Sequence, residues 1–382
     1  MSTHTDISPQ LTHDPEFPFS DDLGPFRVIH VYVPDIGLRA ALVVDNVAAG
    51  PAIGGLRMAP DVSTRECFRL ARAMTLKNAA AGLAHGGGKS VMWADPRMSP
   101  EKKETLVRAF ASALRTEESY IPGPDMGTNE QAMAWVRDEI GRAVGLPREI
   151  GGIPLDEIGA TGLGLRAAAK VAGDYCDVRL DGARVAVQGF GAVGSHAARF
   201  LEEEGARIVG VADSGGTVRD PAGLDLRALI DLKKSGKGVR EYAGAEHGGP
   251  EAIVDVECDI WIPAARPDVI TEANVDRLSA KLILQGANIP VTPGAEQRLH
   301  DRGILSIPDF IANAGGVICA AIEYQGATER AARDAIDEKI TRTTREVLEY
   351  TKSRSVTPRE AAMHIATQRV RRAMTTRRWS VF

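Results

Sequence analysis

The segment of residues 184–194, Arg-Val-Ala-Val-Gln-Gly-Phe-Gly-Ala-Val-Gly, decides the fold of the second half of this chain. Its first five residues are a β-prone run, and its last six match Gly-x-Gly-x-x-Gly. A helical run through Glu204, a second β-prone run at 207–212 and then Asp213 complete a βαβ unit. Such glycines let a pyrophosphate lie against a helix N-terminus, whose unpaired N–H groups favour phosphate. The segment therefore predicts a Rossmann-type dinucleotide-binding domain.

This unit supplies the first candidate cofactor residues. Asp213 would accept hydrogen bonds from the adenosine ribose hydroxyls, and an acid there favours NAD over NADP because a 2′-phosphate would meet a like charge. A plain glycine turn in a flavodoxin-like sheet, with no nucleotide, is the alternative. The predicted cofactor-binding residues of the unit are Gly189, Phe190, Gly191, Ala192, Val193, Gly194 and Asp213.

The sequence on both sides of this unit predicts an α/β chain. Further β-prone runs at 260–263, 282–284 and 304–307 alternate with helical segments, which is typical of a mostly parallel sheet. Helical, charged sequence follows at 331–352 and 358–374. Because 382 residues are too many for one compact core, we expect two domains.

The N-terminal third predicts a second α/β region. Residues 1 to about 25 lack any period and are expected to form a mobile arm, after which 28–33 and 38–44 predict a β-hairpin. Ser63 and Glu66 form a capping box that begins an amphipathic helix ending near residue 84. A further helix is expected over 100–116, followed by an irregular, proline-containing connection at 120–129.

Composition excludes several function classes. A net charge of −5 argues against the basic field that nucleic-acid or anionic-membrane binding requires. The chain has neither an apolar run long enough to span a membrane nor the pattern of a signal peptide, so we expect a cytoplasmic protein. The cysteines have no metal-ligand spacing, so we expect buried free thiols and no metal site; they are Cys67, Cys176, Cys258 and Cys319.

Residues 83–96, Leu-Ala-His-Gly-Gly-Gly-Lys-Ser-Val-Met-Trp-Ala-Asp-Pro, carry the candidate chemistry. Three glycines remove side chains from the approach to Lys89, and Lys77 lies twelve residues upstream, where a neighbouring cation could lower the pKa of Lys89. The alternative is a glycine turn followed by a solvated lysine. Two prolines, 122 and 124, restrict the backbone before Asp125 and give its carboxylate a definite position.

At these residues the chain resembles the glutamate/leucine/phenylalanine/valine dehydrogenases, which oxidatively deaminate L-amino acids with a nicotinamide cofactor. Segment 83–96 satisfies every position of the family signature, and the likeness covers about residues 30–378. It implies that Lys89 is the catalytic lysine. It also implies that Lys77, in Met-Thr-Leu-Lys-Asn-Ala, binds the substrate α-carboxylate and that Asp125, in Pro-Asp-Met-Gly-Thr, transfers protons.

The resemblance also implies the domain organisation. We assign 1–150 and 325–382 to an N-terminal α/β substrate-binding and oligomerisation domain of a homo-oligomer, and 151–324 to the Rossmann-type domain. Some members with Ser-Asp-Ser in place of Ala212-Asp213-Ser214 accept NADP, so NADP is possible. Further residues implied in binding cofactor or substrate are Gly54, Gly55, Met74, Thr161, Ala264, Ala265 and Asn288.

The substrate side chain is predicted from two positions. Glutamate-specific members resemble one another in a lysine and a serine that hold the γ-carboxylate, and this chain has Ile53 and Ala320 there. A carboxylate buried against two apolar side chains would lose hydration without compensation. We therefore expect an apolar, branched-chain or aromatic, L-amino acid. The alternatives are a glutamate dehydrogenase with a relocated carboxylate site, for instance at Arg57, and a non-catalytic nucleotide-binding paralogue.

Overall fold

The computed structural model describes residues 19–376, and residues 1–18 of the expected mobile arm lie outside this range. Two compact units are present: Met1–Ile153 with Ala366–Phe382 forms unit 1, and Pro154–Ile365 forms unit 2. Residues 19–25 of the expected arm are anchored to unit 1, because Arg72 donates hydrogen bonds to both Asp21 and Asp45. Leu23 in the same segment is buried.

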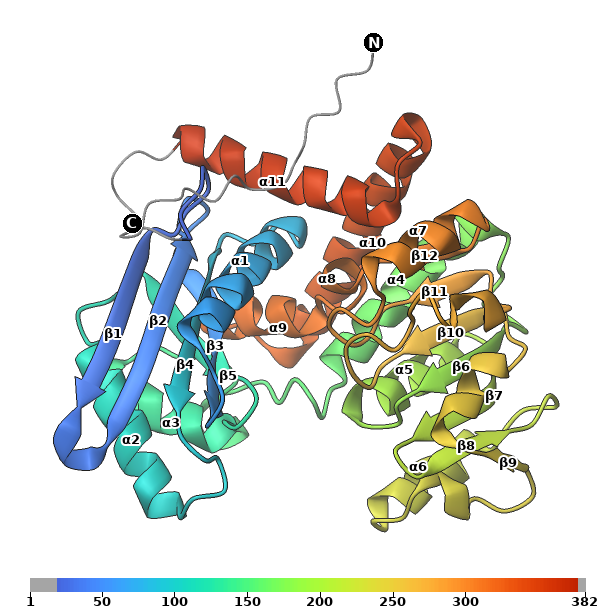
Figure 1. Ribbon diagram of the computed structural model, residues 1–382, viewed down its shortest axis with the longest axis horizontal. Helices are drawn as coiled ribbons and strands as arrows, with labels where there is room; N and C mark the ends of the chain where they lie inside the picture. Colours follow the sequence, from blue (N-terminus) through green and yellow to red (C-terminus); the bar gives the residue numbers. More distant parts are fainter. Residues whose placement is uncertain (1–18, 377–382) are drawn as a thin grey trace. The chain divides into compact units, whose positions relative to one another are not determined.

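Unit 1 is built on a five-stranded mixed sheet with the order β1-β2-β4-β3-β5 (Figure 1). The predicted hairpin is confirmed, since β1 and β2 pair antiparallel with Val28 opposite Val43. Strand β4 lies at the centre, antiparallel to β2 and parallel to β3, and β3 is parallel to β5. The strands are β1 Arg27–Val33, β2 Leu38–Asn46, β3 Ala52–Ala59, β4 Gly86–Trp93 and β5 Tyr120–Pro124.

Three helices cover the two faces of this sheet. Helix α1 (Thr64–Ala80) packs its Cys67 and Ala71 against one face, which is called here the α1 face. Helices α2 (Pro100–Ala113) and α3 (Glu130–Ile140) pack on the other. As predicted, α1 begins at Ser63, whose hydroxyl accepts a hydrogen bond from the Glu66 N–H. It ends at Ala80, four residues before the predicted end.

Tyr120–Pro124 forms strand β5, so the expectation of an irregular connection at 120–129 was wrong for its first half. Pro122 and Pro124 suggested a loop because proline cannot donate a hydrogen bond to a sheet. An edge strand has one side without a neighbouring strand, and β5 is the edge, paired only with β3. The prolines therefore fit the strand, and Asp125 follows directly after it.

Unit 2 is built on a seven-stranded sheet with the order β12-β11-β10-β6-β7-β8-β9. Strands β12 to β7 in this order run parallel, as predicted, and β8 and β9 add an antiparallel edge. The strands are β6 Arg184–Gln188, β7 Arg207–Asp213, β8 Gly216–Arg219, β9 Glu246–Gly248, β10 Ile260–Pro263, β11 Leu282–Leu284 and β12 Leu305–Ile307.

The helices of unit 2 follow the expected alternation with strands. They are α4 Ala160–Cys176, α5 Ala192–Glu203, α6 Leu226–Lys234, α7 Pro293–Asp301, α8 Asp309–Ala312, α9 Gly315–Tyr324 and α10 Glu329–Arg354. Short 3-10 turns lie at Pro34–Ile36, Arg148–Ile150, Val239–Glu241, Pro250–Asp255 and Val275–Arg277. Within residues 19–376, no helix combines the length and apolar character needed to cross a membrane.

The sequence analysis assigned all of 325–382 to the first domain, whereas the structure divides the C-terminal helices between the two units. Helix α10 packs on α4, where Gly164 leaves room for the Ile340 side chain, so residues up to 365 belong to unit 2. Helix α11 (Pro358–Thr376) begins in unit 2, and from Ala366 it belongs to unit 1. The sequence could not show this division, because helix–helix contacts of α10 determine it.

Candidate active site and dinucleotide-binding site

The centre of the candidate active site is Lys89, which lies in the middle of β4, the central strand of unit 1. Side chains alternate along a strand, so Lys89 shares the α1 face with Val91 and Gly87. Its side chain is only 7% exposed. The alternative of a solvated surface lysine after a glycine turn is therefore wrong, since Gly86–Trp93 is a buried strand.

Lys89 and Asp125 form the ion pair that the resemblance implied. The Lys89 Nζ atom lies 2.7 Å from Oδ2 of Asp125, and the Arg57 Nε atom lies 2.9 Å from the same oxygen. Burial raises the pKa of the Asp125 carboxyl, but Lys89 and Arg57 outweigh it and hold the pKa below its usual value. Asp125 is thus a carboxylate at neutral pH, able to accept a proton.

Arg57 is a site residue whose link to Asp125 the sequence analysis missed. It bonds to Glu66 on α1 as well as to Asp125, and both acids raise its pKa against the opposing effect of burial. A signal for it was available: Arg57 lies two residues after Gly55, so the period of a strand puts both on one face. Arg57 fixes one carboxylate oxygen of Asp125, and the Arg57 side chain is itself only 19% exposed.

The glycines before Lys89 mainly allow neighbouring backbone segments to lie close to β4. A Cβ on Gly86 would lie 1.7 Å from the Asn46 carbonyl oxygen, and one on Gly87 would lie 2.0 Å from the Thr75 nitrogen of α1. The expectation that the three consecutive glycines clear the approach to Lys89 was therefore wrong. Gly55 has that role, since its Cβ would lie 2.7 Å from Asp125 Cβ and 3.2 Å from Lys89 Nζ.

Helix α1 carries the predicted substrate-binding residues Met74 and Lys77, both half-buried. It is held on the sheet by Asn78, whose side-chain amide donates to the carbonyls of Ile53 and Gly86 at 3.4 and 2.7 Å. Ile53 is 3% exposed and lies on the α1 face by the alternation that places Gly55 there. Of the predicted residues of unit 1, Lys89 and Asp125 are in direct contact, with Gly55 beside them.

The dinucleotide-binding loop of unit 2 lies between β6 and α5. Gly189 has φ +96°, and a Cβ there would lie 2.7 Å from the Ala265 nitrogen. A Cβ on Gly194 would lie 1.9 Å from the Gly189 carbonyl oxygen, whereas Gly191 has open space beside it. No side chain caps the N-terminus of α5, so its first N–H groups are available to a phosphate. The loop therefore fits the pyrophosphate of a dinucleotide.

Asp213 ends β7 and is held by three donors. The Lys233 Nζ atom lies 2.8 Å from Oδ2, the Val239 N–H donates to Oδ2 at 3.0 Å, and the Gly215 N–H donates to Oδ1 at 2.8 Å. Burial raises the pKa of Asp213, but these bonds outweigh it and lower the pKa. Sequence reasoning missed Lys233, because the twenty residues that separate it from Asp213 have no fixed spacing.

A cavity of about 700 Å³ lies between α5 and α6, and Lys233 is among the residues that line it. Phe190 and Gly191 of the loop, Ser195 and Arg199 of α5, and Lys233 of α6 line it. The space extends from the phosphate loop to the Lys233 ammonium. It is thus large enough for part of a nucleotide.

The remaining predicted residues of unit 2 lie near this loop or on the α8–α9 segment. Thr161 is near the N-terminus of α4 and lines a small cavity with Ala192 and Val193. Ala264 and Ala265 follow β10 and touch the Gly189 position. Asn288 is exposed and its Oδ1 accepts from Asn313 at 3.1 Å, and Ala320 is 8% exposed in α9.

The cysteines are all free, and Cys67, Cys258 and Cys319 are buried as expected. Cys176 is only half-buried, although burial still raises its pKa to about 11. Burial raises the pKa of Cys67, next to the site, to about 12, so this thiol is not a nucleophile. Within residues 19–376, no group of His, Cys, Asp or Glu side chains is arranged to hold a metal ion.

Comparison with known proteins gives matches to both units. The family model described as Glutamate/Leucine/Phenylalanine/Valine dehydrogenase matches residues 151–378, and the model described as Glu/Leu/Phe/Val dehydrogenase, dimerisation domain, matches residues 25–142. The glutamate dehydrogenase of Aeropyrum pernix is 38% identical over 87% of this chain and 85% of its own length. The NADP(+)-dependent glutamate dehydrogenase of Pyrobaculum calidifontis is 36% identical over 93% and 92%.

The fold agrees with a solved structure as well. The Leu-bound form of the hetero-hexameric glutamate dehydrogenase of Thermus thermophilus matches with a TM-score of 0.82 and 29% identity, over 93% of this chain and 91% of that one. The relatives are named as enzymes, which supports a catalytic protein over a non-catalytic paralogue. The chain belongs to the glutamate/leucine/phenylalanine/valine dehydrogenase family and is an NAD(P)-dependent amino acid dehydrogenase.

Proposed function

We propose that this enzyme catalyses the reversible oxidative deamination of L-glutamate to 2-oxoglutarate and ammonia. The observation that carries the substrate is the 36–38% identity with relatives that are named glutamate dehydrogenases, over nearly their whole length. These relatives favour the alternative that the sequence analysis left open over its main expectation of an apolar substrate.

The buried ion pair supports the assignment of roles to the residues of unit 1. Lys77 pairs with the substrate α-carboxylate, and Lys89 orients and activates the water that attacks the imino carbon. Asp125, ionised in the resting site, accepts and returns the proton of the substrate amino group. Bound NAD(P) would supply the hydride acceptor. Arg57 keeps Asp125 in place while Lys89 exchanges partners.

A second candidate substrate, an apolar L-amino acid, is favoured by Ile53. This buried side chain stands where glutamate-specific members would place a lysine. Arg57, the replacement cation suggested by the sequence, is already bonded to Asp125 and Glu66, so a γ-carboxylate would compete with two acids for it. A glutamate enzyme therefore needs its carboxylate contact from another cation.

The substrate test is nicotinamide absorbance with purified protein, ammonia and a panel of 2-oxo acids. We expect turnover of 2-oxoglutarate. Turnover of 4-methyl-2-oxopentanoate or an arylpyruvate with none of 2-oxoglutarate would refute glutamate and establish the second candidate. The variant Ile53→Lys is a matched check: it adds a cation and should abolish turnover of apolar oxo acids while sparing 2-oxoglutarate.

We further propose that NADP is accepted as well as NAD. The sequence analysis favoured NAD because a 2′-phosphate would meet the charge of Asp213. Lys233 compensates that charge, and two backbone N–H groups stabilise the carboxylate independently of it. Lys233 can thus turn to a phosphate without leaving Asp213 unpaired. The name of the Pyrobaculum calidifontis relative supports the same choice.

We also propose that the enzyme is a cytoplasmic homo-oligomer assembled through unit 1. The family model calls residues 25–142 a dimerisation domain. The edge strand β1 and its preceding residue expose Phe26, Val28 and Tyr32, with alternating positions that place them on one face. Light scattering after size-exclusion chromatography should give a multiple of the 40.8 kDa chain mass, and a monomer would refute this assembly.

A further inference from the structure

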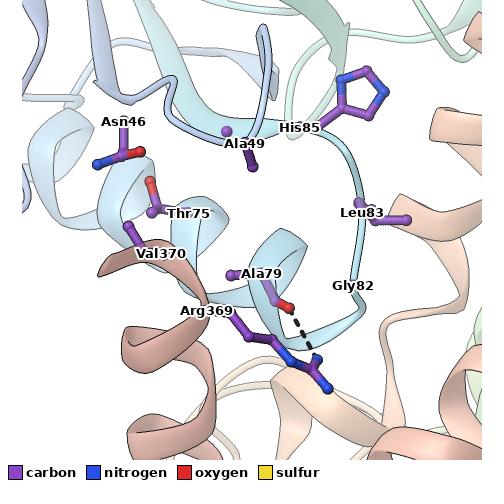
Figure 2. Close-up of a pocket in the computed structure, with 10 residues that line it drawn as sticks. Asn46, Ala49, Thr75, Ala79, Gly82, Leu83, His85, Arg369 and Val370 are labelled. Carbon is purple, nitrogen blue, oxygen red and sulfur yellow. Dashed lines mark hydrogen bonds between the residues drawn. The ribbon is translucent and has the colours of Figure 1, made fainter. Parts of the chain in front are cut away.

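The end of α1 that carries Lys77 is held by a side chain from the other end of the sequence. In unit 1, Arg369 of α11 donates a hydrogen bond to the Ala79 carbonyl at 3.1 Å (Figure 2) and another to the Ala80 carbonyl. These carbonyls belong to the last turn of α1, two and three residues after Lys77. A cation at this place also interacts favourably with the negative end of the helix dipole.

Around this contact part of the last turn borders on a cavity. A cavity of about 250 Å³ lies between α1, the following loop and α11. Figure 2 shows the residues that line it, among them Thr75, Ala79, Leu83, His85, Arg369 and Val370. Because apolar packing is incomplete here, polar contacts have a larger share in fixing the turn.

Other polar contacts hold α1 from different sides. Arg72 bonds to Asp21 and Asp45 two turns earlier, and Asn78, in the last turn, bonds to β3 and β4 on the side of the sheet. Arg369 approaches the carbonyl end itself. Removing its guanidinium would take a charged donor from the Ala79 and Ala80 carbonyls, and the turn would gain freedom to shift.

We propose that Arg369 is a positioning residue for substrate binding: it holds the last turn of α1 and thereby fixes Lys77 for the substrate α-carboxylate. This inference rests on the proposed role of Lys77. It concerns binding rather than chemistry, since Lys89 and Asp125 lie on β4 and at the end of β5, whereas Arg369 bonds to the last turn of α1. Loss of Arg369 should therefore raise the KM of the amino acid and of the 2-oxo acid more than it changes kcat.

The test compares Arg369→Ala and Arg369→Lys with the matched control Arg371→Ala. Arg371 lies on the same helix but pairs with Asp22 in an exposed ion pair, so its removal should change little. For Arg369→Ala we expect a KM for the substrate raised about tenfold, with kcat and the KM for the nicotinamide cofactor within about twofold. Arg369→Lys should restore part of the affinity, because it keeps a cation at the helix end.

Hydrogen exchange gives a readout that needs no activity. The N–H groups of Ala81, Gly82 and Leu83 bond to carbonyls of the last turn, so their exchange reports on its order. We expect faster exchange there in Arg369→Ala but not in Arg371→Ala. Equal exchange in the two variants would overturn the inference, whether or not the enzyme is active.

Kinetics then separates the inference from the proposed function. Faster exchange with an unchanged substrate KM in an active enzyme would also overturn it, because the turn would move without affecting Lys77. If the wild-type protein turns over no member of the panel, the proposed function fails, and binding of the 2-oxo acid measured by calorimetry replaces KM. Equal affinity of wild type and Arg369→Ala would then refute the positioning role.

Discussion

Gly55 faces both members of the Lys89–Asp125 pair, and the substitution Gly55→Ala tests the geometry of the candidate site directly. The added Cβ would lie 2.7 Å from Asp125 Cβ, 2.9 Å from the Pro124 carbonyl oxygen and 3.2 Å from Lys89 Nζ. Carbon atoms in contact lie at about 3.5–4.0 Å, so the two strands must separate by roughly 1 Å. Both members of the Lys89–Asp125 pair would then be displaced.

The expected effect follows from that displacement. Overpacking in a close-packed site costs about 1–3 kcal/mol of folding stability. A displacement of about 1 Å at reacting groups lowers the rate by about a hundredfold. We therefore expect a folded protein with kcat reduced about a hundredfold and a melting temperature lower by a few degrees.

The assay is initial-rate kinetics at saturating substrate, with circular dichroism and NADPH fluorescence to show that both units are folded. Cofactor binding should be retained, because Gly55 belongs to unit 1 and the dinucleotide loop to unit 2. Gly249→Ala is the control, since Gly249 has an ordinary backbone conformation and a Cβ there would meet no atom within 4 Å. Near-normal turnover by a folded Gly55→Ala enzyme would refute the reasoning.

The remaining predictions concern the two charge clusters. Lys89→Ala and Asp125→Asn should each remove most turnover while cofactor binding is retained, and near-normal rates in either would contradict the assigned roles. The pKa of Asp125 is lowered, so its ionised form adds stability that is complete above the usual value of 3.8 and is lost as pH falls through the lowered pKa. Acid unfolding followed by circular dichroism should thus begin at higher pH in Arg57→Ala, because the Asp125 pKa then rises; an unchanged midpoint would exclude this contribution. Lys233→Ala should lower kcat/KM for NADPH about tenfold or more and kcat/KM for NADH far less. The control Lys237→Ala, which changes an exposed lysine near Glu241, should alter neither value. Equal losses for both cofactors would exclude Lys233 as a phosphate partner.

The prediction of the second unit from sequence was reliable because its signals are local. A parallel strand, a glycine loop and a helix follow one another within residues 184–203, and Gly189 and Gly194 each have a backbone reason visible in the structure. The first unit was harder to predict. Its strand β5 contains two prolines, and only its place at the sheet edge makes them acceptable.

The candidate site shows the same division. Lys89 and Asp125 could be identified in sequence by motif, but the motif attributed the open approach to the wrong glycines. Gly55 and Arg57 contact the pair because β3 lies between β4 and β5 in the sheet, and that strand order is not written in the local pattern. Likewise, the charge of Asp213 could be read from the sequence, whereas its compensation by Lys233 could not.

By itself, the sequence determined the α/β class, the dinucleotide-binding unit and the identity of the lysine and aspartate that we propose carry the chemistry. Those features depend on backbone conformation and residue type over short stretches, where neighbours in sequence are neighbours in space. Only the tertiary structure decided which glycine clears the ion pair, which arginine supports it and which distant side chain holds the end of α1. These depend on contacts between segments separated by tens to hundreds of residues, whose geometry is set by strand order and helix packing.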